Sequence, residues 1–158
     1  MSDTTITDID PAGDVLIICY KPTDDGDKVL GTLRISSKVL SLASPVFGAM
    51  LEPSKNLNDS QTNLESDVKR LKIQCESLDI LVNVMNITHI QNQRIPATVT
   101  LIFLYDLATW CDTYQVAEAL TPVINRWIEI LWVPRPPIGH DQFAVDMEWM
   151  WIAKVFHK

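Results

Sequence analysis

The sequence predicts an α+β fold in which a small sheet is covered by a cluster of short helices. Three observations point to this class. Short runs rich in β-branched residues lie in the first half of the chain, helical spacings of apolar residues fill the second half, and strands that precede helices in this way are typical of α+β domains. The 158 residues, 47% hydrophobic and 21% charged, suffice for one globular domain with a real core.

The first two strands form a predicted hairpin. Val15–Tyr20 is a short run rich in β-branched residues, and Val29–Ile35 alternates along one face. Between them, Gly26 supplies the positive φ that a hairpin turn needs. A third strand over Val68–Ile73 completes a small, mainly antiparallel three-stranded sheet. Residues 1–13 are expected to form a flexible tail.

The helices are predicted from caps and apolar spacing. Ser36 and Ser37 can cap a short helix, and Ser44 before Pro45 begins a second one. Further helices are expected to begin near Ser77, Thr100, Tyr114 and Thr121. We assign 14–133 to the domain, and 134–158 to a Pro-containing break and a C-terminal helical extension.

Charge and hydropathy exclude several classes of function. The chain carries 13 basic and 20 acidic residues, a formal charge of −7, which disfavours direct binding to nucleic acid. Its apolar runs are far shorter than the roughly 20 residues that cross a bilayer. The start, Met1–Asp8, lacks the basic and apolar regions of a secretory signal, so we expect a cytoplasmic or nuclear protein.

The residues that carry chemistry do not form a motif. The three histidines are far apart, and Asp24, Asp25 and Asp27 lack the ligand spacing of a calcium loop. No nucleophile elbow, phosphate loop or dinucleotide fingerprint is present. Cys19 and Cys111 are expected to be buried thiols rather than nucleophiles. The sequence thus predicts no enzyme, no metal site and no cofactor.

One long stretch resembles a known family. Leu33–Met50, with the sequence LRISSKVLSLASPVFGAM, resembles the core signature of a BTB/POZ domain, in the form common in uncharacterised proteins of filamentous fungi. Gly13–Ile17 is similar to the family's first shared strand, and Leu104–Tyr114 to its Leu-Ala-x-x-x-Asp-x-Tyr helix end. Trp149–Phe156 is similar to a segment that follows the domain in the fungal proteins.

The resemblance implies a protein–protein interaction module that self-associates, acts as an adaptor for a cullin-type ubiquitin ligase, or does both. Alternatives are an interaction arm of a transcription regulator and a degenerate fragment of a longer BTB protein. By the resemblance, a cullin would meet the second short helix, the loop after it and the break near Gln91. The residues implied there are Ser44, Phe47, Glu52, Pro53, Asn92 and Arg94. For Phe47, packing in the core is the competing interpretation.

The chain also departs from the family pattern. Many animal BTB domains carry a histidine and a basic residue where this chain has Ser36 and Ser37. The family's buried pocket pairs that basic residue with an acid at the position of Asp14. Its loss disfavours the transcription-regulator alternative.

Tryptophan is concentrated in the C-terminal third of the chain. Because tryptophan is enriched at interface hot spots, a self-association surface is one interpretation. The other is that the tail folds back and buries these rings in the same chain. The candidates are Trp127, Trp132, Trp149 and Trp151.

Overall fold

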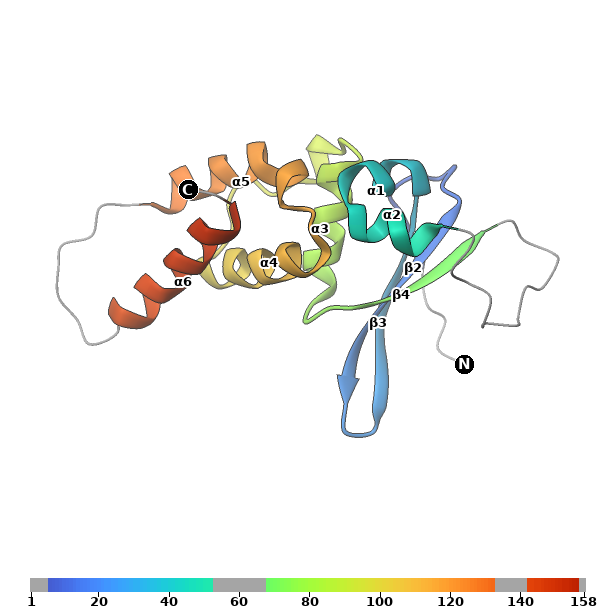
Figure 1. Ribbon diagram of the computed structural model, residues 1–158, viewed down its shortest axis with the longest axis horizontal. Coiled ribbons are helices and arrows are strands. Elements are labelled where there is room, and N and C mark those ends of the chain that lie inside the picture. The colour runs from blue at the N-terminus through green and yellow to red at the C-terminus, as the bar shows by residue number, and fades with distance from the viewer. Residues whose placement is uncertain (1–5, 53–67, 133–141, 157–158) are drawn as a thin grey trace.

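A computed structural model describes residues 6–52, 68–132 and 142–156, the last range without the side chains of 142–144. It confirms the α+β class: helices gather on one side of a four-stranded sheet (Figure 1). The strands are β1 (Ile6–Asp8), β2 (Val15–Thr23), β3 (Gly26–Ile35) and β4 (Lys69–Gln74). The helices are α1 (Ser37–Ala43), α2 (Pro45–Leu51), α3 (Leu78–Thr88), the 3-10 helix η2 (Asn92–Arg94), α4 (Leu101–Tyr114), α5 (Ala117–Leu131) and α6 (Gln142–Phe156).

The sheet corrects the expected three-stranded, mainly antiparallel arrangement. Its order is β1-β3-β2-β4, and only β2 and β3 are antiparallel. β3 ends beside Val15, the first residue of β2, and β4 begins beside that same residue at Lys69. The chain therefore leaves β3 and enters β4 at the same end of the sheet, the end where β2 begins. β4 for this reason runs parallel to β2.

The N-terminal segment corrects a second expectation. Residues 6–8 of the expected flexible tail form β1, which pairs in parallel with β3. Ile9 is buried in the core, and its N–H donates to the Arg34 carbonyl at 3.1 Å. The Arg34 guanidinium also lies 3.2 Å from the Asp8 carboxylate. Burial of Ile9, together with these polar contacts to Arg34, therefore holds this segment in place.

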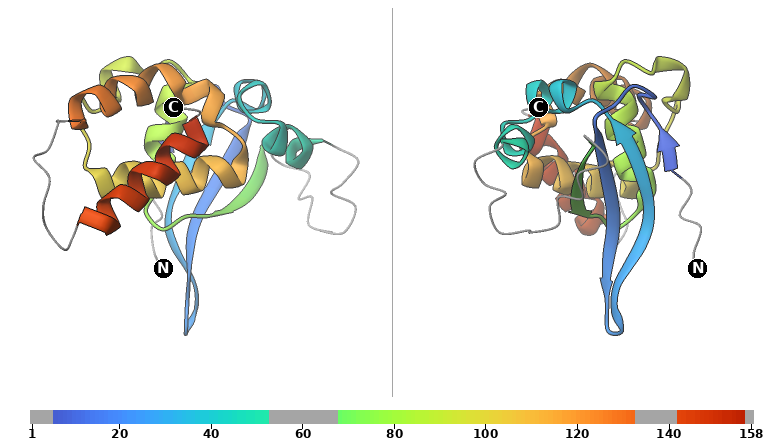
Figure 2. Two further views of the ribbon diagram at one scale, coloured as in Figure 1. Left: turned by 60° about the vertical axis from the view of Figure 1, so that its left-hand side comes forward. Right: turned by 90° about the vertical axis from the view of Figure 1, so that its right-hand side faces the viewer.

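The β2–β3 hairpin extends past the rest of the sheet. β4 pairs with β2 only as far as Tyr20, and beyond this point the two strands project away from the helices (Figures 1 and 2). A bulge shifts the register between Cys19 and Tyr20. Gly26 has φ of 116°, as the turn requires, so the predicted positive φ is confirmed.

One core joins the sheet to the helices. Ile17 of β2, Leu33 of β3 and Ile73 of β4 pack with the buried faces of the helices. α3 starts directly against the sheet, since a Cβ on Gly31 would lie 2.7 Å from Leu78 Cδ2. α6 lies along α4 and also contacts α5 (Figure 2), and its Ile152 is buried in this core.

α5 corrects a third expectation. The sequence predicts one helix that ends at Leu120 and a new one at Thr121-Pro122, but the structure has a single helix with Pro122 inside it. A proline in a helix interior costs about 3 kcal/mol. Burial of Leu120, Ile124 and Trp127 along one continuous face offsets that cost.

The start of α1 is capped by side chains from two distant elements. The Asp14 carboxylate accepts from the Ser37 N–H at 2.8 Å and from the Ser37 hydroxyl at 2.6 Å. His89, which ends α3, accepts from the Ser36 N–H through Nε2 at 3.1 Å. Its other nitrogen, Nδ1, lies 2.9 Å from the Met85 carbonyl and must carry the proton there. These two hydrogen bonds of His89 therefore require its neutral form.

Both acceptors have shifted pKa values. Hydrogen bonds from the Ser37 hydroxyl and N–H lower the pKa of Asp14 below its usual 3.8. Burial lowers the pKa of His89 below its usual 6.5, against an opposing effect of the Met85 carbonyl. The neutral imidazole that Ser36 needs is thus the form that burial favours.

We predict that acidification weakens the fold through His89. Because the pKa of His89 is lower in the folded chain than in the unfolded chain, its contribution is complete above about pH 6.5 and is lost as the pH falls through the folded value. Urea unfolding at several pH values between 7.5 and 5 should show this loss. His89→Gln keeps an acceptor but cannot titrate, so it should remove that part of the pH dependence. An unchanged slope in His89→Gln would contradict the assignment.

Candidate interaction surfaces

Ser44 and Phe47, implied as partner contacts by the resemblance, lie inside the molecule. The Ser44 hydroxyl caps α2 by accepting from the Phe47 N–H at 3.1 Å, and it donates to the Tyr114 carbonyl. The Phe47 ring stacks on that of Tyr114, with centroids 5.1 Å apart. Both residues are fully buried, so neither side chain is available to a partner. They hold α2 against the end of α4, which agrees with the core interpretation of Phe47.

The other residues implied by the resemblance are at the surface, where the structure describes them. Glu52 is exposed at the end of α2, and Pro53 lies outside the described residues. Asn92 and Arg94 are exposed in η2, which follows α3. Arg94 also donates to the Asp8 carbonyl at 3.0 Å. These polar side chains are accessible, but they come from the ends of different helices.

The four candidate tryptophans divide into three environments. Trp127 is buried and donates from Nε1 to the Pro96 carbonyl at 2.9 Å. Trp149 and Trp151 are half-buried, and Trp151 Nε1 donates to the Thr109 hydroxyl at 3.1 Å. Trp132 is 60% exposed and meets Trp149 edge-on, with centroids 5.2 Å apart. The tail therefore folds back over α4, and Trp132 keeps most of its ring accessible.

The most exposed apolar side chains lie elsewhere. Leu42 of α1 is 82% exposed, and Ile90, just after α3, is 76% exposed. Val39, one turn before Leu42, lines a pocket of about 330 Å³ together with Pro11 and Ile90. We call Pro11, Val39, Leu42 and Ile90 the α1–α3 surface.

Ile90 is held in an unusual backbone conformation. Its φ is 59°, in the left-handed region that glycine favours and that β-branched residues avoid. The Ile90 N–H donates to the Ile87 carbonyl at 3.1 Å, and the Gln91 N–H to the Asn86 carbonyl at 2.8 Å. This is a Schellman ending of α3, with isoleucine where glycine is usual. Strain of this kind is typical of positions whose side chain has a role.

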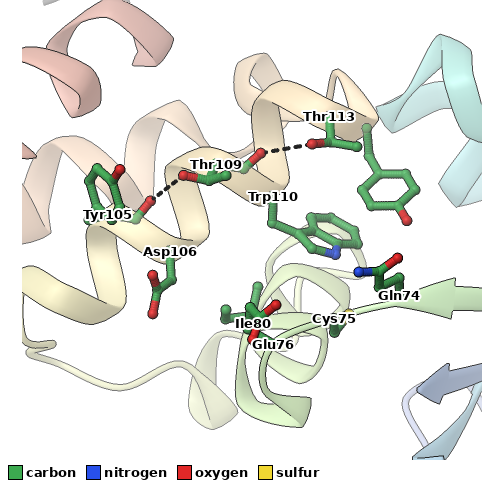
Figure 3. Close-up of a pocket in the computed structure, with 10 residues that line it drawn as sticks. Gln74, Cys75, Glu76, Ile80, Tyr105, Asp106, Thr109, Trp110 and Thr113 are labelled. Atoms are coloured by element: carbon green, nitrogen blue, oxygen red, sulfur yellow. Dashed lines mark hydrogen bonds between the residues drawn. The ribbon is translucent and has the colours of Figure 1, made fainter. Parts of the chain in front are cut away.

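A second pocket lies between the end of β4 and α4 (Figure 3). It has a volume of about 350 Å³, and we call it the β4–α4 pocket. Burial, and to a lesser extent the charge of Glu76, raise the pKa of Asp106 in its wall. Its lining consists of Gln74, Cys75, Glu76, Ile80, Tyr105, Asp106, Thr109, Trp110, Thr113 and Tyr114.

The Cys111 thiol lies in the core. Burial raises the pKa of the Cys111 thiol, which disfavours the thiolate that a nucleophile needs. Among the described residues, no three His, Cys, Asp or Glu side chains are grouped as metal ligands, and no helix there could span a membrane. Neither the known protein-family models nor the curated proteins match this chain.

No pattern in the sequence marks the two most exposed apolar residues or the β4–α4 pocket. The short helix predicted after Ser36 and Ser37 contains Val39, Leu40 and Leu42, but periodicity in a helix of seven residues does not tell which face is covered. Ile90 carried no turn signal, because isoleucine is not a residue expected at positive φ. The pocket joins Glu76 and Asp106, which are thirty positions apart in sequence.

We predict that Ile90→Gly stabilises the monomer. Glycine removes the left-handed strain, and part of that gain is lost to the greater freedom of the unfolded chain, so the free energy of unfolding should rise by roughly 0.5 to 1 kcal/mol. Thermal or urea unfolding at low protein concentration measures it. Ile90→Ala is the matched control, because it removes the same exposed side chain but keeps Cβ and the strain. Equal stability of the two variants would count against strain at Ile90.

Proposed function

We propose that this chain is a protein-interaction module of the BTB/POZ type, cytoplasmic or nuclear, that self-associates through the α1–α3 surface. The observation that carries the proposal is the exposure of Leu42 and Ile90, each a large apolar side chain more than three-quarters accessible. Exposed apolar side chains gathered on one surface are typical of interaction sites, and Val39 connects the two here, since it lies one turn from Leu42 and lines a pocket with Ile90. In addition, the Ile90 side chain is exposed from a backbone conformation that is strained for isoleucine.

The surface is suited to a two-fold dimer. In such an interface the same surface of both protomers is in contact, so Leu42 and Ile90 of each protomer would be buried, four side chains in all. Burial of four side chains of this size contributes about 6–12 kcal/mol before the cost of association. That cost is about 4 kcal/mol at the least, so these four side chains support a net gain of at most about 8 kcal/mol, which corresponds to micromolar affinity at the tightest.

The BTB/POZ assignment is supported by the order of the elements. A hairpin, two short helices, a strand and then a series of helices follow one another as the resemblance implies. The stretch that carries the resemblance, Leu33–Met50, spans the end of β3, α1 and most of α2. It therefore forms the connection that sets the direction of β4. The comparisons with known proteins give this assignment no support, so it rests on the residues and on their arrangement.

A cullin adaptor is the second candidate function. The specific observation in its favour is that Glu52, Asn92 and Arg94 are accessible at the positions that the resemblance implies. Polar side chains at helix ends are suited to the rim of an interface rather than to its apolar centre. A cullin would therefore need further apolar contacts on this chain.

We predict that light scattering across a micromolar concentration range finds a dimer of about twice 17.9 kDa. Leu42→Lys should weaken dimerisation by at least about tenfold, because it places a charge in the buried patch. Ile102→Lys is the matched control: Ile102 is 67% exposed on α4, away from the α1–α3 surface, and its replacement should leave dimerisation unchanged.

Either of two outcomes would overturn the self-association proposal. One is a folded monomer at every concentration, and the other is equal weakening by the two lysine variants. The adaptor candidate is then tested with a purified cullin N-terminal domain. Arg94→Glu should reduce its binding, and absence of binding by the wild-type chain would exclude this candidate as well.

A further inference from the structure

We propose that the β4–α4 pocket binds an arginine side chain of a partner protein, with a backbone carbonyl of the same segment accepting from Trp110 Nε1. This site is separate from the α1–α3 surface and does not depend on self-association. Its walls come from the residues that follow β4, the first turn of α3 and one side of α4 (Figure 3).

The lining offers negative charge and no basic side chain. Glu76 and Asp106 are both among the ten lining residues, and none of the ten is a lysine, arginine or histidine. Glu76 already pairs with Lys21, whose Nζ lies 2.7 Å from its carboxylate. Asp106 forms no ion pair with a described residue. A cation in the pocket would therefore find one unpaired carboxylate.

Partial burial of the Asp106 carboxylate favours the binding of a cation beside it. Asp106 is partly withdrawn from water, and both this burial and the charge of Glu76 disfavour its ionised form, which raises its pKa. A cationic hydrogen-bond donor beside it would reverse both effects. The opposite occupant, an anion, would be repelled by both acids.

The hydroxyl groups of the pocket also favour a donor. Thr113 donates its proton to the Thr109 carbonyl at 3.0 Å, and Thr109 donates to the Tyr105 carbonyl at 3.1 Å (Figure 3). The Thr113 oxygen is left with acceptor capacity. Arginine supplies five N–H donors and no acceptor, and its planar guanidinium can lie against the Tyr105 ring in the pocket wall.

Trp110 supplies the second, independent observation. The residue is only 6% exposed, and its Nε1 donates no well-aligned hydrogen bond to a described residue. A buried N–H group without a good acceptor is unfavourable, because it has given up its hydrogen bond to water. In Figure 3 the indole nitrogen points toward the side of the pocket formed by Gln74 and Cys75. The Cys75 sulfur near it is a weak acceptor, so a stronger one is still required.

A peptide carbonyl could be that acceptor. To reach the buried indole nitrogen, the segment would have to enter on the side of the pocket that the exposed Gln74 lines. A volume of about 350 Å³ is at the lower end of the range of ligand pockets, which suits one side chain and its backbone better than a large cofactor. The occupant that meets these conditions is an arginine within an extended segment.

The test uses the indole N–H signals of the five tryptophans in a ¹⁵N-correlated NMR spectrum of the full chain. Loss of one signal in Trp110→Phe assigns Trp110. The probe is the peptide acetyl-Ala-Arg-Ala-amide, and its neutral counterpart carries citrulline in place of arginine. We expect the arginine peptide to shift the Trp110 signal in a saturable manner and the citrulline peptide to bind at least about tenfold more weakly.

Variants on α4 complete the test. Asp106→Asn should weaken arginine-peptide binding about tenfold, whereas Asp112→Asn, an exposed aspartate on the same helix outside the pocket, should leave it unchanged. If Asp106→Asn fails to fold, Glu76→Gln, at an exposed position, should still weaken binding measurably. The proposal is overturned if the Trp110 signal does not move, if both peptides bind equally, or if the Asp112 variant loses as much affinity as the pocket variants.

Discussion

The arrangement of the helices depends on how the first turn of α1 is satisfied. The first N–H groups of a helix have no acceptor within the helix. Here Asp14 and His89 provide acceptors from outside the helix for two of these N–H groups. Asp14 precedes β2 and His89 ends α3, so these bonds tie one end of the sheet, α1 and α3 together. α2 follows α1 after one residue, Ser44, whose hydroxyl then fixes the end of α4. Each later contact thus builds on the first.

The contacts of Asp14 and His89 with the start of α1 also explain what replaces the basic residue that the resemblance implies. The resemblance implies that the acid at Asp14 pairs with a basic residue, and the chain keeps the acid but has Ser36 and Ser37 where the histidine and the basic residue would lie. One carboxylate with two hydrogen bonds from Ser37 satisfies the helix start without a second charge. This arrangement leaves no basic group at this position for a partner to recognise.

Local features of the sequence could be predicted, and long-range ones could not. Ser36, Ser44, Ser77 and Thr100 all cap helices as expected, because each of these side chains accepts from an N–H only two or three positions further along the chain. The direction of β4 and the pairing of β1 depend on where distant segments meet. The same limit applies to the surfaces. The apolar spacing includes Trp127 in a helix, but its burial depends on contacts with Pro96 and Phe103, which are distant in sequence, whereas Trp132 meets only the edge of Trp149 and stays exposed.

The projecting hairpin exposes backbone groups that no neighbouring strand satisfies. Beyond Tyr20, neither edge of the ribbon is paired with a third strand among the described residues. Bare edges of this kind can recruit strands from other chains and lead to aggregation. Here Pro22 removes one donor from the edge of β2, and Lys21 and Lys28 stand directly opposite each other. A strand from a second molecule would have to accommodate Lys28 and the Lys21–Glu76 ion pair, so these side chains oppose the pairing that the bare backbone edge would allow.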